Sequence, residues 1–147
     1  MEELHLFYAG EYIEEILNEI KPDICESAEI TIEVNPGTVD KNKLKKYIKC
    51  GINRLSIGLQ TTDDKLLKQI GRIHNYKEFL YTYEEARKVG FKNINVDLML
   101  GLPDQSLKIL EKSLKEVINL KPEHISIYSL ILEKGTLLDK KVLFRRT

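Results

Sequence analysis

The sequence has 147 residues, 42% of them hydrophobic, which is enough for one globular domain with a core of its own. Its 23 Lys and Arg residues balance its 23 Asp and Glu residues, so no net positive field is available to hold a polyanion and we expect no nucleic-acid partner. The start lacks a basic stretch followed by an apolar core, and no apolar run approaches the roughly 20 residues that span a bilayer. The composition therefore predicts a cytoplasmic chain without a membrane span.

The two cysteines, Cys25 and Cys50, are too few for a disulfide framework. They are also too far apart for a thiolate metal site of the usual spacing. We expect two unpaired thiols in a reducing compartment and assign no metal ligand.

Helical and strand patterns alternate along the chain. The predicted elements are, in chain order, a helix over 11–20, a strand over 29–35, a helix ending at Gly51, a strand over 54–60, a short helix over 63–70, a helix from Asn75 to Gly90, a strand over 93–99, a helix from Ser106 to before Pro122, and a strand over 124–130. Asn75 and Glu78 have the spacing of a capping box, and Ser106 is a favourable N-cap. This order predicts a parallel sheet with right-handed crossovers and helices on its faces.

Apolar and polar residues alternate in the strands, whereas strands buried on both faces of a parallel sheet are usually apolar throughout. The polar set comprises Thr31, Glu33, Asn35, Ser56, Gly58, Gln60, Asn95, Asp97, Ser126 and Tyr128. Helices must cover the apolar face, so we expect the polar face to line the interior of a barrel with a wet or ligand-filled lumen.

Glu33, Gln60 and Asp97 lie near the carboxyl ends of their strands, where β/α barrels and open α/β sheets bind ligands. A lone acid at such a place can instead accept backbone hydrogen bonds from the next loop. Arg72, in the loop 71–74, is either a solvated surface cation or a fork-shaped partner for a carboxylate ligand. We expect His74 to pack within its loop and His124 to be exposed.

Five segments in order carry a family resemblance: ITIEVNPGT at 30–38, GINRLSIGLQ at 51–60, GRIH at 71–74, INVDLMLGLPDQS at 94–106 and PEHISIYSL at 122–130. They resemble the radical S-adenosyl-methionine (SAM) family, and within it the heme chaperones of the HemW type and the oxygen-independent coproporphyrinogen III oxidases. The GRIH and NPGT segments are more similar to the chaperone branch. The resemblance implies an α/β fold: a partial (β/α) radical SAM barrel with parallel strands and outer helices. Because such a barrel takes about 250 residues, we expect it not to be closed.

The resemblance also implies cofactor-binding residues. The positions that match the family's S-adenosyl-methionine site are Glu33, Gln60, Arg72 and Asp97. Arg72 suits the methionine carboxylate, and the other three suit the ribose hydroxyls or the amino group. Ile131 matches a position that backs the cofactor through its main chain, although an apolar residue there also has a core interpretation. No catalytic residue is assigned.

The chain departs from the family in ways that bear on activity. The CxxxCxxC loop that holds the 4Fe-4S cluster is absent, as is the GGGTP stretch that receives the methionine end. We expect a non-family leader over 1–10, a partial radical SAM core over 11–136, a divergent tail over 137–147, and exposed strand edges at 29–35 and 124–130.

The functional expectation is a fragment of a heme chaperone, inactive alone, whose complete parent binds S-adenosyl-methionine, a 4Fe-4S cluster and heme or porphyrin. Two alternatives stay within the family: a fragment of a coproporphyrinogen III oxidase, which performs oxidative decarboxylation, and a non-catalytic binding module that joins a separately encoded N-terminal half. The third alternative is an ordinary β/α-barrel hydrolase or isomerase. Proteins of that class commonly carry a phosphate-binding loop, and this sequence shows none.

Overall fold

Four parallel strands form one open sheet. The computed structural model describes residues 3–135, with the side chains of residues 12–20 and 22–135. The strands are β1 (Thr31–Val34), β2 (Arg54–Gln60), β3 (Ile94–Leu100) and β4 (His124–Ser129), and their order in the sheet is β1-β2-β3-β4. Each neighbouring pair is parallel. Within this part of the chain β1 and β4 are the outer strands and the sheet does not close, so the expected open, partial barrel is confirmed.

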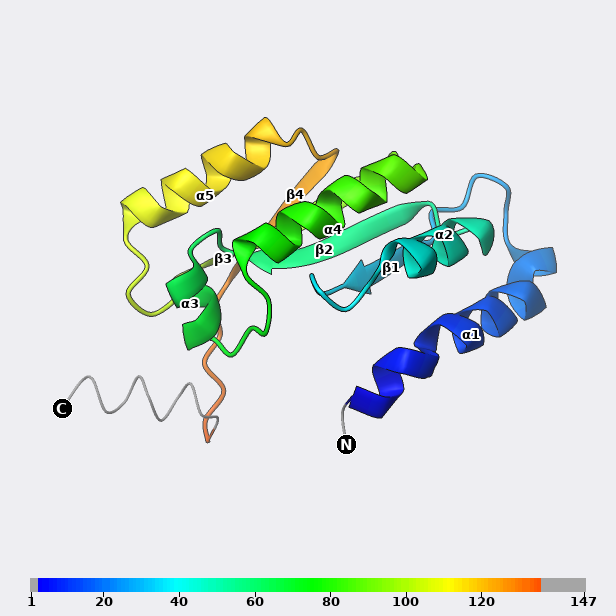
Figure 1. Ribbon diagram of the computed structural model, residues 1–147, viewed down its shortest axis with the longest axis horizontal. Helices are drawn as coiled ribbons and strands as arrows, with labels where there is room; N and C mark the ends of the chain where they lie inside the picture. The colour runs from blue at the N-terminus through cyan, green and yellow to red at the C-terminus, as the bar shows by residue number, and fades with distance from the viewer. Residues whose placement is uncertain (1–2, 136–147) are drawn as a thin grey trace.

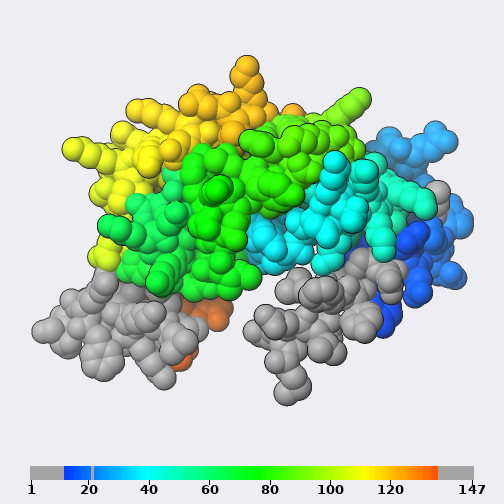
Figure 2. Space-filling view, viewed as in Figure 1, coloured from blue at the N-terminus to red at the C-terminus, as the bar shows by residue number. Residues whose placement is uncertain are grey.

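The connections are helical. The helices are α1 (Glu3–Ile20), the short 3-10 helix η1 (Lys21–Asp23), α2 (Lys41–Lys49), α3 (Asp64–Gln69), α4 (Tyr76–Val89) and α5 (Leu107–Asn119). Figure 1 shows α2, α4 and α5 side by side on one face of the sheet, with α1 next to α2. The space-filling view shows α2, α4 and α5 covering that face (Figure 2). Helix α1 begins at Glu3, earlier than the expected start at residue 11. No helix in residues 3–135 is long and apolar enough to cross a membrane.

Local capping chemistry sets the helix ends. The main-chain N–H of Glu78 donates to Asn75 Oδ1 at 2.9 Å and that of Asn75 donates to Glu78 Oε2 at 2.8 Å, so the expected capping box is present. Ser106 caps α5 as expected. Asp40 caps α2 through the N–H of Lys43, in addition to the caps expected from the sequence. These caps satisfy N–H groups that have no partner inside the helix.

The core lies between the sheet and the helix layer. The apolar faces of the two central strands are completely buried and comprise Leu55, Ile57, Leu59, Ile94, Val96 and Leu98. They pack with Leu44 and Tyr47 of α2, Phe79 and Tyr83 of α4, and Val117 of α5. Burial of each such aliphatic side chain contributes about 1.5–3 kcal/mol, so these contacts fix which face of the sheet receives the helices. The strand alternation is confirmed at the centre of the sheet, and the opposite face is left for polar residues.

Candidate functional site

Three polar side chains from separate segments converge over Gly58 of β2. A Cβ atom placed on Gly58 would lie 3.1 Å from Asn35 Oδ1, 3.2 Å from Gln60 Nε2 and 3.5 Å from Arg72 Nη2. Arg72 also donates a hydrogen bond from Nη1 to Asn35 Oδ1. The absence of a side chain at Gly58 therefore lets Asn35, Gln60 and Arg72 approach one point of the backbone.

Gln60 has an unusual backbone conformation. Its φ angle is 75°, in the left-handed region that non-glycine residues seldom occupy, and the pairing of β2 with β3 shifts between Gly58 and Gln60. The side chain is nevertheless buried. Residues held in such conformations cluster at ligand sites, and here the irregularity brings Gln60 close to Gly58.

Arg72 is half-buried beside a carboxylate. Burial lowers the pKa of its guanidinium, and the negative charge of Asp97 acts in the opposite direction. The guanidinium carries five N–H donors and stays charged in proteins. Its main-chain N–H is bound to the carbonyl of Leu67 at 3.0 Å, which anchors the loop after α3. Arg72 thus presents a charged donor fork, of a kind that matches a carboxylate ligand.

Asp97 belongs to a hydrogen-bonded network on the polar face. Its carboxylate accepts hydrogen bonds from Ser56 Oγ at 3.0 Å and from Asn95 Nδ2 at 2.7 Å. Asn95 in turn donates to Ser56 Oγ at 2.9 Å and accepts from Ser126 Oγ at 2.9 Å. The network crosses β2, β3 and β4 and orients Asp97 through neighbouring side chains. The hydrogen bonds to the Asp97 carboxylate therefore come from side chains and not from the backbone N–H groups of the next loop.

The remaining candidates differ in their surroundings. Glu33 is exposed on β1 and pairs in register with Ser56, so it borders the same polar row. Ile131 lies just beyond β4 and is 82% exposed, which makes its core interpretation wrong. No contact recorded for the described residues joins Ile131 to the group around Gly58. Glu33, Gln60 and Asp97 thus belong to the polar face of the sheet, and the guanidinium of Arg72 reaches that face from the loop after α3.

His74 and His124 have the expected environments. His74 is 5% exposed, and neither ring nitrogen has a partner of good hydrogen-bonding geometry within residues 3–135. Burial lowers its pKa, a nearby main-chain group of Leu59 raises it, and the charge of Arg72 lowers it further. Its neutral form is favoured, as suits a residue that packs within its loop. His124 is exposed.

Asn35 and Gly58 are functional candidates that the site assignment from sequence missed. Asn35 follows Glu33 by two positions, so the alternation placed it on the correct face, but nothing in the sequence indicates that it contacts Arg72. Gly58 is a small residue among polar neighbours of the same face. An isolated glycine inside a strand is the signal for a close approach of this kind.

The family model for the radical SAM superfamily matches residues 3–117. The chain belongs to the radical SAM superfamily. Heme chaperone HemW of Bacillus subtilis (strain 168) is 43% identical over 122 residues, which cover 83% of this chain and 32% of that protein. The family resemblance seen in the motifs is thereby confirmed.

Solved structures agree with this placement. The radical SAM enzyme coproporphyrinogen III oxidase from Escherichia coli superimposes with a TM-score of 0.79 at 27% identity, covering 90% of this radical SAM chain and 31% of the oxidase. The methyltransferase TsrM from Kitasatospora setae, solved with cobalamin and a [4Fe-4S] cluster, superimposes with a TM-score of 0.77 at 14% identity, a likeness of fold alone. The chain spans about a third of the length of these relatives.

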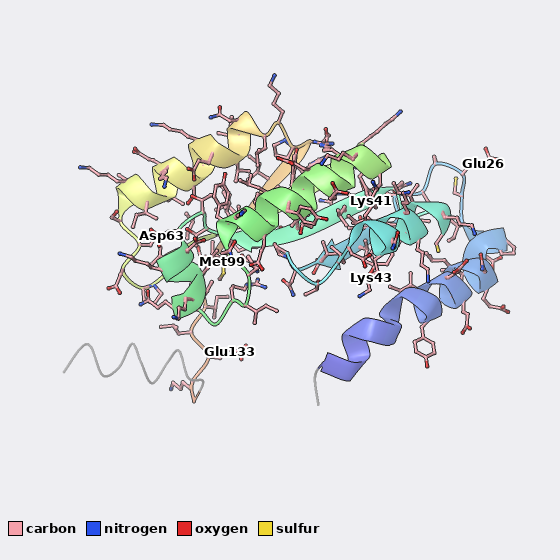
Figure 3. All side chains as sticks on the ribbon, in the orientation of Figure 1. Glu26, Lys41, Lys43, Asp63, Met99 and Glu133 are labelled. Atoms are coloured by element: carbon pink, nitrogen blue, oxygen red, sulfur yellow. The ribbon has the colours of Figure 1, made fainter. Side chains whose placement is uncertain are left out.

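The two cofactors of the family fit this chain differently. The polar groups of Asn35, Gln60 and Arg72, which converge over Gly58, are donors and acceptors that suit a ligand with a carboxylate and hydroxyl groups. A 4Fe-4S cluster needs thiolates, and the two cysteines of the sequence border residues Ile30 and Asn53, at the amino ends of β1 and β2. Figure 3 shows Glu26, the neighbour of Cys25, at the opposite end of the molecule from Asp63 and Met99. The residues present do not fit the cluster.

Proposed function

We propose that this chain supplies part of the S-adenosyl-methionine-binding face of a heme chaperone of the HemW type. The observation that carries the proposal is the convergence of Arg72, Asn35 and Gln60 over Gly58. The 43% identity to the Bacillus subtilis heme chaperone supports this branch of the superfamily. Glu33, Gln60, Arg72 and Asp97 match positions of the family's S-adenosyl-methionine site, and this match supports S-adenosyl-methionine as the ligand.

Each residue has a role that follows from its chemistry. Arg72 binds the methionine carboxylate of the cofactor, and Asn35 positions Arg72 through their hydrogen bond. Gln60, Asp97 and Glu33 bind the ribose hydroxyls or the amino group, and Asp97 is already oriented by its side-chain network. Ile131 contributes only through its main chain. S-adenosyl-methionine supplies radical chemistry when bound.

The cluster ligands are assigned to protein outside this sequence, because the two thiols lie at the wrong end of the sheet. We assign no catalytic step to this chain. Heme or porphyrin is the cargo or substrate of the complete protein, and a separately encoded N-terminal half is one source of the cluster-binding loop.

A coproporphyrinogen III oxidase is the second candidate, favoured by the TM-score of 0.79 to that enzyme. Its identity to this chain is lower, at 27%, than the 43% of the heme chaperone. The two candidates share the cofactor site, so the comparison between them must be made on heme binding and decarboxylation.

Two hybrid proteins test the proposal. In one, this chain replaces the matching segment of the Bacillus subtilis heme chaperone, and in the other it replaces the matching segment of the Escherichia coli oxidase. We expect the first hybrid to bind S-adenosyl-methionine and heme like its parent, and the second to lose decarboxylation. Both parents are measured beside the hybrids, at matched cluster content. A decarboxylating oxidase hybrid together with a chaperone hybrid that binds no heme would reverse the assignment.

A further inference from the structure

Both cysteines line one hollow at the amino ends of the strands. The hollow has a volume of about 280 Å³, and its wall includes Cys25, Cys50, Leu17 of α1 and Ile30. Cys25 lies in the loop between η1 and β1, and Cys50 is the residue that ends α2. Two thiols 25 positions apart in the sequence are thus brought to one cavity by the fold.

Asn53 holds the two cysteine-bearing segments together. Its Nδ2 donates to the carbonyl of Ala28 at 2.8 Å, and its Oδ1 accepts from the N–H of Ile30 at 2.8 Å. The N–H of Ala28 in turn binds the carbonyl of Cys25 at 2.9 Å, closing the turn that carries this cysteine. Because Ala28 is three residues after Cys25 and Asn53 is three after Cys50, these bonds keep both thiols beside the hollow.

The two thiols have unequal surroundings. Cys25 is exposed, and its Sγ lies 3.2 Å from Ser27 Oγ. Hydrogen bonds from the Ser27 side chain and main chain lower the pKa of Cys25. Cys50 is half-buried, and burial followed by the charge of Glu14 raises its pKa, while Lys49 and Lys46 oppose this shift. An exposed thiol whose pKa is lowered, lining the same hollow as a second thiol, is typical of a redox-sensitive pair.

We propose that Cys25 and Cys50 form a thiol–disulfide exchange site, in which Cys25 reacts first with a low-molecular-weight disulfide and Cys50 resolves the product. The Cys25 thiolate attacks one sulfur of the small disulfide, forms a mixed disulfide and releases one thiol. The Cys50 thiolate then attacks Cys25 Sγ, forms the internal disulfide and releases the second thiol. Each protein thiol loses one proton and one electron, and the small disulfide is reduced to two thiols. The site lies at the opposite end of the sheet from Gly58, so the proposal does not depend on S-adenosyl-methionine binding.

The purified chain, reduced and then exposed to glutathione disulfide, tests the sequence of steps by intact-protein and peptide mass spectrometry. We expect a transient glutathione adduct on Cys25, followed by a Cys25–Cys50 disulfide and the loss of both free thiols. The Cys50→Ser variant should accumulate the adduct on Cys25. The Cys25→Ser variant should react several-fold more slowly. Ser27→Ala should slow the first step near neutral pH but not at a pH where the thiol is fully ionised, because the hydroxyl acts by stabilising the thiolate.

The folded arrangement is tested by repeating the reaction in denaturant, where residues 25 and 50 meet only by chain diffusion. Resolution by Cys50 should be faster in the native chain than in the unfolded one. Equal reactivity of the two cysteines, a persistent glutathione adduct on the wild type, or faster resolution in denaturant would each overturn the proposal. Circular dichroism of each variant confirms that the comparison is made between folded proteins.

Discussion

Gly58 is the residue around which the polar groups of β2 and its neighbours are arranged. Replacing it by alanine would put a Cβ at 3.1 Å from Asn35 Oδ1 and 3.2 Å from Gln60 Nε2, tighter than ordinary contact. Asn35 is exposed and can move aside, but the movement would break its hydrogen bond to Arg72. The substitution therefore acts on the site more than on the core.

For Gly58→Ala, measured in the chaperone hybrid, we expect affinity for S-adenosyl-methionine to fall by about tenfold, the effect of weakening one charge-assisted hydrogen bond. The free energy of unfolding of the chain should change by no more than about 1 kcal/mol, since alanine is more favourable than glycine inside a strand. Calorimetry and denaturant unfolding measure the two effects. Unchanged affinity would mean that the polar groups over Gly58 do not bind the cofactor.

Arg72 provides a sharper test of the same site. Arg72→Ala in the chaperone hybrid should weaken S-adenosyl-methionine binding by roughly ten- to over a hundredfold, because a hydrogen bond to a charged group is typically worth about 1.5–3 kcal/mol. Lys68→Ala, an exposed cation on the preceding helix α3, is the matched control and should be nearly silent. Calorimetry at matched cluster content separates lost affinity from lost iron. If both Arg72→Ala and Lys68→Ala bind S-adenosyl-methionine like the parent hybrid, Arg72 packs its loop and does not bind the cofactor.

At the level of elements, Arg87 joins helix α4 to the connection between α5 and β4. Its guanidinium contacts both carboxylate oxygens of Glu123, at 2.9 and 3.1 Å, and donates to Tyr83 Oη at 2.8 Å and to the carbonyl of Lys121 at 3.0 Å. Glu123 Oε2 also accepts from the N–H of Ile94 at the start of β3. Arg87 thus connects helix α4 to the start of β4 directly, and to the start of β3 through Glu123.

We expect Arg87→Met to lower the free energy of unfolding by about 1–3 kcal/mol at neutral pH, because partly buried acceptors lose their donor. Lys77→Met, on the exposed side of the same helix, should change it by no more than about 0.5 kcal/mol. Urea unfolding of both variants measures the difference. An equal effect of the two substitutions would show that the network adds nothing to stability.

The Arg87 effect should depend on pH. Partial burial raises the pKa of Glu123, but hydrogen bonds from Arg87 and from the N–H of Ile94 outweigh it and leave the pKa below its ordinary 4.5. A lowered carboxyl pKa contributes stability that is complete above the unfolded-state value and is lost as the pH falls through the folded-state value. The difference between wild type and Arg87→Met should therefore be largest near neutral pH and shrink in acid below 4.5.

At the scale of the whole molecule, the sheet has two outer edges within residues 3–135. On β4, Ile127 is 44% exposed and Tyr128 55% exposed, although Ile125 of the same strand packs against the core. An outer strand offers unpaired N–H and C=O groups, and apolar side chains beside them favour association.

We expect the purified chain to self-associate in a concentration-dependent manner, as followed by sedimentation velocity. Ile127→Lys should weaken the association, because a charge on an outer strand opposes pairing with another edge. Ile118→Lys, at a 57% exposed position on helix α5, should leave it largely unchanged. A wild-type chain that stays a monodisperse monomer at every concentration would contradict this expectation.

Much of the architecture could be predicted from the sequence because it depends on local chemistry. The capping box at Asn75, the N-cap at Ser106 and the alternation along β2 and β3 are properties of neighbouring residues, and each is present in the structure. Strand β2 has the predicted bounds and the others differ by one or two residues at their ends. The resemblance carried by the five motifs placed the chain in its family, which the comparisons confirm.

The tertiary structure alone decided which side chains meet. Asn35 contacts Arg72 across 37 positions, and Asp97 contacts Ser56 across 41, because strand register and the fold of the loop after α3 bring them together. The same holds for Cys25 and Cys50, which the sequence presents as two isolated thiols and the fold places around one hollow. Local patterns determine the face on which a side chain lies, whereas contacts between distant segments depend on the register and packing of the whole sheet.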